Sequence, residues 1–137
     1  MNKITVAATV NAPLEQVWTK WNEPTHITKW AFASDDWEAP RADNDVRTGG
    51  KFTTVMAAKD GSSSFDFTGT YSKVQPMEVI EYDMSDGRHV TIQFTPLPDG
   101  VKVTETFDPE TENSEELQRS GWQAILDNFK KYVEGTK

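Results

Sequence analysis

The sequence predicts an α+β domain in which a curved antiparallel β-sheet wraps around one long C-terminal helix. Three observations support this fold class. Short segments that alternate between apolar and polar residues recur along most of the chain, as expected of β-strands. Turn signals such as Asp-Gly join neighbouring segments directly, which favours hairpins over parallel βαβ units. Residues 114–134 instead have the apolar periodicity of an amphipathic helix.

The chain begins with a predicted strand that is followed by two short helices. Residues 4–10, ITVAATV, alternate with the period of a strand. Val17, Trp18 and Trp21 then follow at helical spacing. Pro24 cannot continue that helix but suits the first turn of another, which carries Ile27 and Trp30.

The middle of the chain predicts an antiparallel meander. Residues 52–57 and 65–71 alternate between two faces, as do the segments VIEYDMS, HVTIQF and VKVTETF. Two Asp-Gly pairs, Asp86-Gly87 and Asp99-Gly100, separate the last three of these segments. If Val90 and its inward neighbours face the core, His89 points outward; if strand coiling inverts this, His89 joins the polar groups near the interior.

The C-terminal helix carries two residues that its apolar face does not explain. Asn113 and Glu116 have the spacing of a capping box at its start. Gly121 lies within the apolar arc, although a glycine there costs about 1 kcal/mol relative to alanine. Either the helix approaches the sheet backbone at this point, or a space is kept open beneath it. Gln118 lies on the same face and needs a hydrogen-bond partner there.

The composition indicates one domain, residues 1–137, without a nucleic-acid or membrane partner. A length of 137 residues fits a single domain. The 22 acidic residues outnumber the 14 basic ones and give a formal charge of −8, which repels nucleic-acid phosphates and anionic lipids. The chain has no cysteine, and its N-terminus has no apolar signal segment. We therefore expect a cytoplasmic protein.

Four motifs resemble, in order, those of one protein family. The opening VNAPLEQVWTKWNEPTHITKW resembles a strand that ends in Ala-Pro before two helices with paired tryptophans. DVRTGGKF resembles the family's Asp-x-Arg-x-Gly-Gly-x-Phe element, and FTGTYSKVQPMEVIEY its Gly-x-Tyr strand with a proline corner. SGWQAILDNFKKYVEG resembles its C-terminal Gly-Trp helix. The chain thus resembles the activator of Hsp90 ATPase homologue-like branch of the SRPBCC (START/Bet v 1-like) superfamily, which implies the helix-grip fold.

The resemblance implies several functions. Members of the superfamily enclose an apolar cavity between the grip helix and the sheet, and many bind hydrophobic small molecules there. Some are cyclases or dehydratases. The named branch includes a co-chaperone domain that stimulates a chaperone ATPase and that follows a second domain in the eukaryotic co-chaperone. Since nothing precedes Met1 here, we expect that second domain to be absent, which disfavours the ATPase-activator function.

Other kinds of site are disfavoured by the motifs themselves. Gly49-Gly50-Lys51 is followed by Phe52 and a strand-like run, so it predicts a tight turn rather than a phosphate-binding loop. Arg47 beside Asp43 and Asp45 predicts a local ion pair that fixes that turn. The chain has two histidines, too few for a His-based metal triad, and we expect no metal and no cofactor. We expect His26 to lie on the surface.

The aromatic residues on the predicted inner faces outline a candidate cavity, and Gly69 and Gly121 omit side chains on those faces. Tyr71, Tyr82 and Gln118 are the polar groups expected to orient a ligand there. Trp122 is expected to anchor the helix beside the space that Gly121 leaves. The predicted ligand-binding residues are Trp30, Trp37, Phe52, Met56, Phe67, Tyr71, Tyr82, Met84, Gln118, Gly121 and Trp122.

We therefore predict a monomer or weak homodimer that binds an apolar or aromatic small molecule without transforming it. Two other functions remain open. A cyclase- or dehydratase-like enzyme would be favoured by a buried acid with a strongly raised pKa. An interaction module acting on a chaperone or another protein would be favoured by a contiguous exposed apolar patch on the outer face of the sheet.

Overall fold

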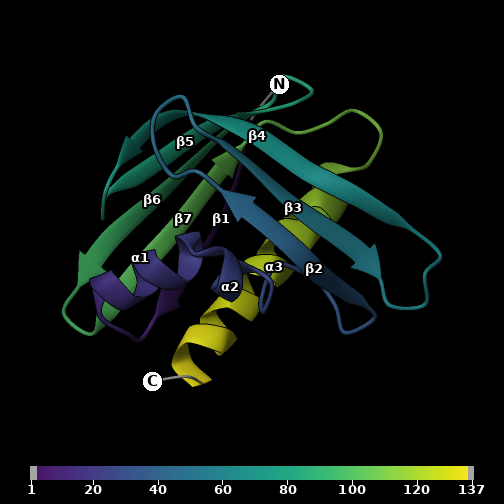
Figure 1. The fold of residues 1–137 in the computed structure, drawn as a ribbon. Helices are drawn as coiled ribbons and strands as arrows, with labels where there is room; N and C mark the ends of the chain where they lie inside the picture. Colours follow the sequence, from purple (N-terminus) through teal and green to yellow (C-terminus); the bar gives the residue numbers. More distant parts are fainter. Residues whose placement is uncertain (1–2, 136–137) are drawn as a thin grey trace.

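The computed structural model describes residues 3–135. Its strands form one seven-stranded antiparallel sheet in the order β1-β7-β6-β5-β4-β3-β2. Figure 1 shows this sheet curled around the long helix α3, with α1 and α2 together near one end. The elements are β1 (Ile4–Val10), α1 (Leu14–Asn22), α2 (Pro24–Ile27), β2 (Trp37–Asn44), β3 (Lys51–Ala58), β4 (Ser64–Gln75), β5 (Val79–Met84), β6 (His89–Leu97), β7 (Gly100–Phe107) and α3 (Glu115–Gly135).

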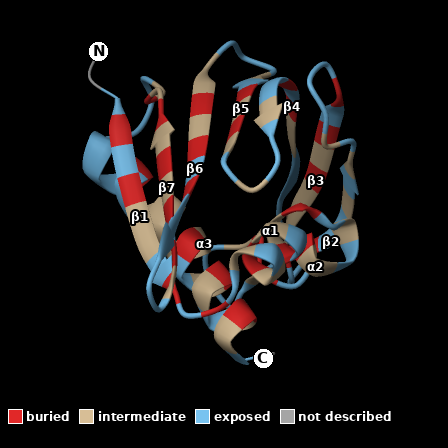
Figure 2. Cartoon of the chain, turned by 90° about the vertical axis from the view of Figure 1, so that its left-hand side faces the viewer, coloured by how far each residue is buried: buried red, intermediate tan, exposed pale blue. Residues whose placement is uncertain are grey.

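The inner face of the sheet follows the period-2 pattern of the sequence. On β6, Val90, Ile92 and Phe94 are buried, and on β7 the buried positions alternate from Val101 to Phe107. Figure 2 shows the resulting bands of buried and exposed residues along these strands. Because side chains on a strand alternate between faces, one side of the sheet turns toward α3 and the other toward solvent. The predicted helix-grip architecture is confirmed.

Aromatic side chains close one end of this architecture, and we call their cluster the packed end: Trp18, Trp21, Trp30, Phe94 and Phe129. Trp21 and Trp30, from the first two helices and the turn after them, each lie 4.8 Å from the Phe129 ring of α3, measured between centroids. Phe94 on β6 contacts both Trp18 and Trp21. Aromatic pairs of this geometry add to the free energy of burial, so the packed end holds the first two helices on the C-terminal half of α3.

The N-terminus of α3 differs from its prediction. The Ser114 hydroxyl accepts a hydrogen bond from the backbone N–H of Leu117 at 3.1 Å, so Ser114 and not Asn113 caps the helix. The backbone N–H of Asn113 instead donates to the Glu110 carboxylate. The capping-box spacing was therefore off by one residue, because the loop before the helix uses Asn113 for its own turn.

The Gly-Gly motif forms the predicted tight turn between β2 and β3. Gly49 has a φ of +86°, which L side chains rarely adopt. A Cβ on Gly50 would lie 2.1 Å from the carbonyl oxygen of Asp45. The Arg47 Nε contacts the Asp45 carboxylate at 2.9 Å, as expected. Asp43, the other expected partner, instead pairs with the Arg41 Nε at 3.2 Å. The motif therefore serves the hairpin.

None of the helices within residues 3–135 is long and apolar enough to cross a membrane.

Candidate functional site

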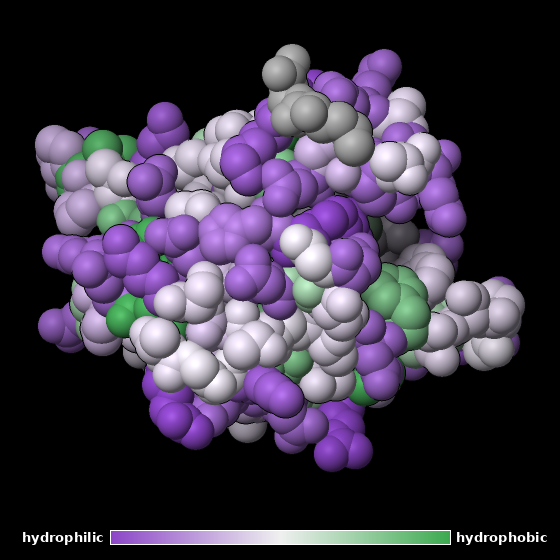
Figure 3. All heavy atoms as spheres, turned by 90° about the horizontal axis from the view of Figure 1, so that it is seen from above, coloured by the Kyte–Doolittle hydropathy of each residue, from purple (hydrophilic) through white to green (hydrophobic). Residues whose placement is uncertain are grey.

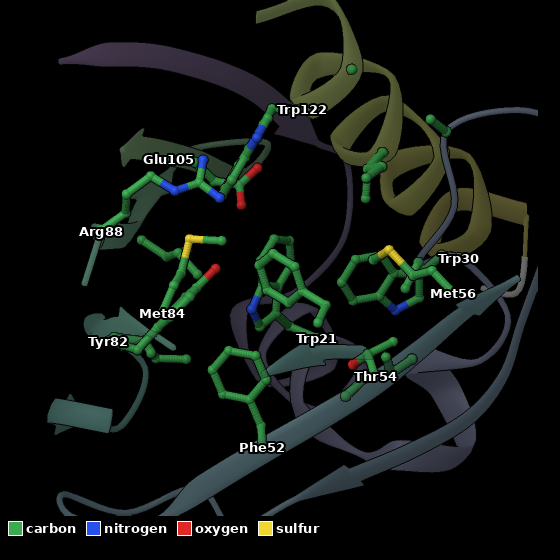
Figure 4. A pocket seen from close by; sticks show the side chains of 18 of the residues that line it. Trp21, Trp30, Phe52, Thr54, Met56, Tyr82, Met84, Arg88, Glu105 and Trp122 are labelled. Carbon is green, nitrogen blue, oxygen red and sulfur yellow. The ribbon is translucent and has the colours of Figure 1, made fainter. Parts of the chain in front are cut away.

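A cavity of about 410 Å³ lies between the inner face of the sheet and the N-terminal half of α3. Its walls come from β3, β4, β5, β6 and β7 on one side and from α3 on the other, with Trp21 and Trp30 of the packed end closing it. Figure 4 shows these side chains pointing into a common space. Of the residues predicted to bind a ligand, those that line the cavity are Trp30, Phe52, Met56, Phe67, Tyr71, Tyr82, Met84, Gln118, Gly121 and Trp122.

Trp37, by contrast, is not among the cavity-lining residues. It begins β2, the edge strand of the sheet, and pairs with Ala58 at the end of β3. Its ring packs against Phe65, with 5.9 Å between centroids. Phe65 does line the cavity, so Trp37 lies behind a lining residue. The prediction for Trp37 is corrected, because the alternating pattern indicates which face a residue occupies but not how far along the sheet the cavity extends.

A network of aromatic contacts forms the cavity walls. Phe52 touches Tyr82 edge to face, with 4.7 Å between ring centroids, and lies 5.7 Å from Phe67. From α3, Trp122 stacks on Phe107 of β7 at 3.9 Å with an interplanar angle of 11°. Trp122 therefore anchors the helix to the sheet beside the cavity, as predicted. Its position leaves the neighbouring turn of α3 above open space.

Gly121 lies above that open space. A methyl group built on Gly121 would have no heavy atom within 4 Å outside its own chain neighbours and helical turn. Of the two explanations considered for this glycine, close backbone contact is therefore excluded, and an open space beneath the helix is found. The glycine enlarges the cavity at the cost of helix propensity.

Gly69 was also predicted to leave room in the interior, but another residue fills its place. A Cβ there would lie 2.6 Å from a ring carbon of Phe52 and 3.0 Å from the carbonyl oxygen of Asp83. The Phe52 ring thus covers the glycine directly. Gly69 permits the close approach of an aromatic ring and does not add volume to the cavity.

Gln118 lines the cavity, but its amide serves the loop before α3. Its Oε1 accepts a hydrogen bond from the backbone N–H of Glu110 at 2.8 Å. Its Nε2 contacts the carbonyl oxygens of Asn113 at 2.9 Å and of Glu110 at 3.2 Å. Both ends of the amide therefore have partners, as a buried amide requires. The expected role of Gln118 in orienting a ligand is thus weakened, since its polar atoms already fix the loop.

The two tyrosines in the cavity differ in their hydrogen bonding. The Tyr71 hydroxyl donates to the Asn44 side-chain oxygen on β2. The Tyr82 hydroxyl makes no hydrogen bond to any residue in the range 3–135. Burial raises the pKa of both phenols above the usual value, so both keep their protons. Tyr82 is therefore the tyrosine with a donor to offer.

Glu105 is the functional candidate that sequence reasoning missed. It lies on the inner face of β7 between Val103 and Phe107, lines the cavity, and is 6% exposed. Its carboxyl group makes no hydrogen bond or ion pair with any described residue. Burial raises its pKa to about 8, because an unpaired charge is costly in an apolar site. The alternation in VKVTETF, which puts Glu105 on the same face as Val101 and Val103, was the available signal.

The cavity opens between the start of β4 and the start of α3. Phe65 on β4 and Leu117 on α3 are the most exposed of the large apolar lining residues, at 49% and 60%. Figure 3 shows a recess in the surface with hydrophobic atoms beside it. The first two helices lie at the opposite end, which the tryptophans of the packed end fill. The opening is therefore formed by the starts of β4 and α3, away from the packed end.

Neither histidine reaches the cavity. His89 lies on the outer face, where its ring nitrogens contact the carboxylates of Asp83 at 2.8 Å and Glu81 at 2.9 Å. These carboxylates raise the pKa of His89, the Asp83 hydrogen bond most. His26, expected on the surface, is partly exposed, and its ring contacts the Tyr132 hydroxyl at 2.6 Å and links α2 to α3. Among residues 3–135, no three His, Asp or Glu side chains are placed to bind a metal ion.

Comparisons with known proteins agree with this architecture. The model of the family described as activator of Hsp90 ATPase homolog 1-like protein matches residues 11–134. The solution structure of an AHSA1-like protein from Aeromonas hydrophila is 46% identical, with a TM-score of 0.93 over 98% of this chain and 93% of that one. No curated protein matches the sequence at a significant level.

Two further solved structures extend the comparison. A protein from Cytophaga hutchinsonii is 56% identical, with a TM-score of 0.85 over 99% of this chain and 94% of that one. A protein from Chromobacterium violaceum is 24% identical, with a TM-score of 0.86 over 98% and 99% of the two chains. At this lower identity, the similarity concerns the fold alone.

Proposed function

We propose that this chain, which belongs to the activator of Hsp90 ATPase homolog 1-like family, binds an apolar or aromatic small molecule in its cavity without transforming it. The observation that carries the proposal is the open, aromatic-lined space of about 410 Å³ beneath Gly121. This volume falls within the range of small-molecule sites. Protein interiors normally pack without such voids, so a space of this size indicates an occupant.

Burial of the ligand's apolar surface supplies the affinity. Each Å² of apolar surface removed from water contributes about 25 cal/mol before the costs of association are subtracted. Rings on the walls, including Phe52, Phe67 and Trp122, are already packed against one another, so little side-chain freedom remains to be lost on binding. A preorganised wall of this kind favours rigid, flat ligands.

Native mass spectrometry of the purified protein tests the proposal first. A stoichiometric extra mass that disappears on denaturation supports a bound ligand and points to its chemistry. If the protein has only its own mass, titration with naphthalene follows, with affinity read by calorimetry. We expect saturable one-to-one binding by the wild-type protein.

A matched pair of leucine variants locates the binding site. Gly121→Leu places a side chain in the cavity, so we expect at least a roughly tenfold loss of naphthalene affinity. Ser120→Leu adds the same side chain at the exposed neighbouring position and leaves the affinity unchanged. Equal affinities for wild type and Gly121→Leu would contradict the proposed site.

An enzyme of cyclase or dehydratase type is the second candidate, and Glu105 is the observation that favours it. Its buried carboxyl, with a pKa of about 8, meets the criterion of a tuned proton donor. A second group to accept a proton is harder to find in the described walls, because burial keeps Tyr71 and Tyr82 protonated. Deuterium uptake by an aromatic methyl ketone in D₂O, faster with wild type than with Glu105→Gln, would support this function over simple binding.

The structure offers less support for a chaperone-directed interaction module. The exposed large apolar residues within 3–135 are Phe65, Leu97 and Leu117. Phe65 and Leu117 belong to the cavity mouth, and Leu97 ends β6, so they do not form a patch on the outer face of the sheet. Stimulation of a chaperone ATPase on mixing would nevertheless favour this function directly.

A further inference from the structure

One end of the cavity carries a buried acid with no partner. Glu105 is flanked on its own strand by Val103 and Phe107, and its neighbours across the ladder are Val6 on β1 and Ile92 on β6. These neighbours offer neither a hydrogen-bond donor nor a positive side chain. Glu105 lines the cavity together with other polar residues. Figure 4 shows the Glu105 side chain directed into this space from β7.

The surroundings of Glu105 favour its neutral form. An unpaired carboxylate in an apolar site takes up a proton rather than bear the cost of burial, and the pKa of Glu105 is correspondingly raised to about 8. At neutral pH the carboxyl group is therefore an O–H donor, a state known from other apolar sites.

Arg88 lines the same end but does not neutralise Glu105. The Arg88 Nε pairs with the Asp86 carboxylate at 2.8 Å, and no ion pair joins it to Glu105. Arg88 is close enough to lower the pKa of Tyr82 by its charge. A positive charge at this end disfavours a cationic ligand. It leaves the Glu105 carboxyl group facing the cavity without an ion-pair partner among residues 3–135.

Tyr82 supplies a second donor at the same end. Its hydroxyl has no hydrogen-bond partner among residues 3–135, whereas that of Tyr71 is used by Asn44. Glu105 is among the groups that raise the pKa of Tyr82, which places the two side chains in one neighbourhood. Figure 4 shows the Tyr82 hydroxyl and the Glu105 carboxyl directed into the same part of the cavity. Two O–H donors thus face this end of the cavity, and neither hydrogen-bonds to an acceptor among residues 3–135.

We propose that the natural ligand is an uncharged aromatic compound with a carbonyl group, whose oxygen accepts hydrogen bonds from the Glu105 carboxyl and the Tyr82 hydroxyl. This inference rests on the proposed binding function and specifies its ligand class. Buried donors left unpaired are costly, and a carbonyl oxygen, with two lone pairs, can satisfy both. Fixed donors in a dry site also discriminate strongly between ligands that do and do not present an acceptor.

The groups around Glu105 predict how binding depends on pH. Among residues 3–135, the titratable and charged groups that line the cavity together with Glu105 are Tyr71, Tyr82, Arg88 and Glu110. β1, β6 and α3 present Val6, Ile92 and Trp122 instead. The Tyr82 pKa lies well above its usual value, so Tyr82 keeps its proton over this range. Loss of the Glu105 proton above about pH 8 is therefore the change that removes a donor.

Two probes of nearly equal shape test the inference. 2-Acetonaphthone has the carbonyl oxygen, and 2-isopropenylnaphthalene has a CH₂ group in its place. We expect the wild-type protein near neutral pH to bind the ketone roughly tenfold more tightly than the alkene, as a buried hydrogen bond predicts. The carbonyl stretch of the bound ketone shifts to lower frequency in the infrared spectrum.

Variants of Glu105 test whether its carboxyl group causes the preference for the ketone. Glu105→Leu abolishes both the preference and most of the infrared shift, whereas Glu105→Gln, which keeps an N–H donor, retains both. Raising the pH above about 8 reduces the preference in wild type but not in Glu105→Gln. Tyr82→Phe reduces the preference in part, and circular dichroism confirms that each variant is folded.

The outcomes separate this inference from the proposed function. Binding of neither probe contradicts both. Equal binding of ketone and alkene by wild type, or an unchanged ketone preference in Glu105→Leu, leaves the binding function intact but overturns the inference. Tighter binding of 2-naphthoate than of the ketone also overturns it, because a carboxylate would then be the ligand group and Arg88 its partner.

Discussion

The two halves of α3 pack against the sheet in different ways. In the C-terminal half, Leu126, Phe129 and Val133 are fully buried, and the tryptophans of the packed end fill the space beneath them. In the N-terminal half, Gly121 faces open space and Trp122 and Ile125 are half-buried around the cavity.

This difference separates stability from binding within a single helix. A helix that is dense along its whole length would leave no room for a ligand, and one that is open along its whole length would lack a core. The C-terminal half holds the helix against the first two helices, so the N-terminal half can cover a cavity at little cost to the fold. Substitutions in the N-terminal half should therefore alter ligand binding while leaving most of the folding free energy intact. Substitutions in the C-terminal half should lower the folding free energy with less effect on the cavity.

The largest effect expected from this comparison is a stability difference between two leucines. Leu126→Ala removes a fully buried side chain and should lower the free energy of unfolding by about 2–5 kcal/mol. Leu117→Ala removes a side chain that is 60% exposed and should cost less than about 1 kcal/mol. Urea denaturation of both variants measures the difference. Similar losses for the two would show that the halves do not differ in packing.

A second effect concerns the pH dependence that the cavity imposes. The Glu105 pKa is raised from 4.5 to about 8 in the folded protein, so the folded state binds a proton that the unfolded state has already released. Stability therefore falls as pH rises between these values, by about 1.4 kcal/mol per pH unit at most. Relative to Glu105→Gln, the wild type should lose about 2 kcal/mol between roughly pH 5.5 and 7.5.

Denaturation curves of the two proteins over this pH range provide the test. Using their difference cancels the contributions of carboxylates whose pKa is lowered, such as Asp86 and Asp108. If the difference in unfolding free energy between the two proteins stays constant across the range, Glu105 is charged in the folded protein. The proposed ligand class would then lose its support, because a charged Glu105 cannot donate a hydrogen bond.

The third comparison concerns the two glycines, and the smallest expected effect is that of Gly121→Ala. Gly69→Ala brings a methyl group against the Phe52 ring and should cost about 1–3 kcal/mol. Gly121→Ala meets no atom within 4 Å outside its own turn and should gain up to about 1 kcal/mol from helix propensity. Thermal denaturation distinguishes the signs. A loss of stability in Gly121→Ala would indicate that the space beneath the helix is closed in solution.

The fold could be predicted from the sequence because it depends on local patterns. Alternation marks the strands, the Asp-Gly pairs mark two hairpins, and the apolar arc marks α3. The conflict between Gly121 and its helix also pointed to the open space. In each case the signal lies within a few neighbouring residues, where propensity and periodicity decide the structure.

The chemistry of the site was less accessible because it depends on distances across the sheet. The pattern placed Gln118 inside but could not show that the loop before α3 takes both ends of its amide. Trp37 was on the expected face but beyond the end of the cavity. Glu105 was visible in its alternating strand, yet its importance comes from the missing partner, which only the three-dimensional arrangement reveals.

The most direct test of the cavity is to map a bound apolar probe by NMR. Naphthalene is titrated into the labelled protein, and the amide signals of the two halves of α3 are compared. We predict that residues 117–125 and the Trp122 indole N–H shift strongly, and that Leu126, Phe129 and Val133 shift much less. Shifts centred on the C-terminal half or on the outer face of the sheet, or no shifts at all, would contradict a ligand site beneath the N-terminal half of the helix.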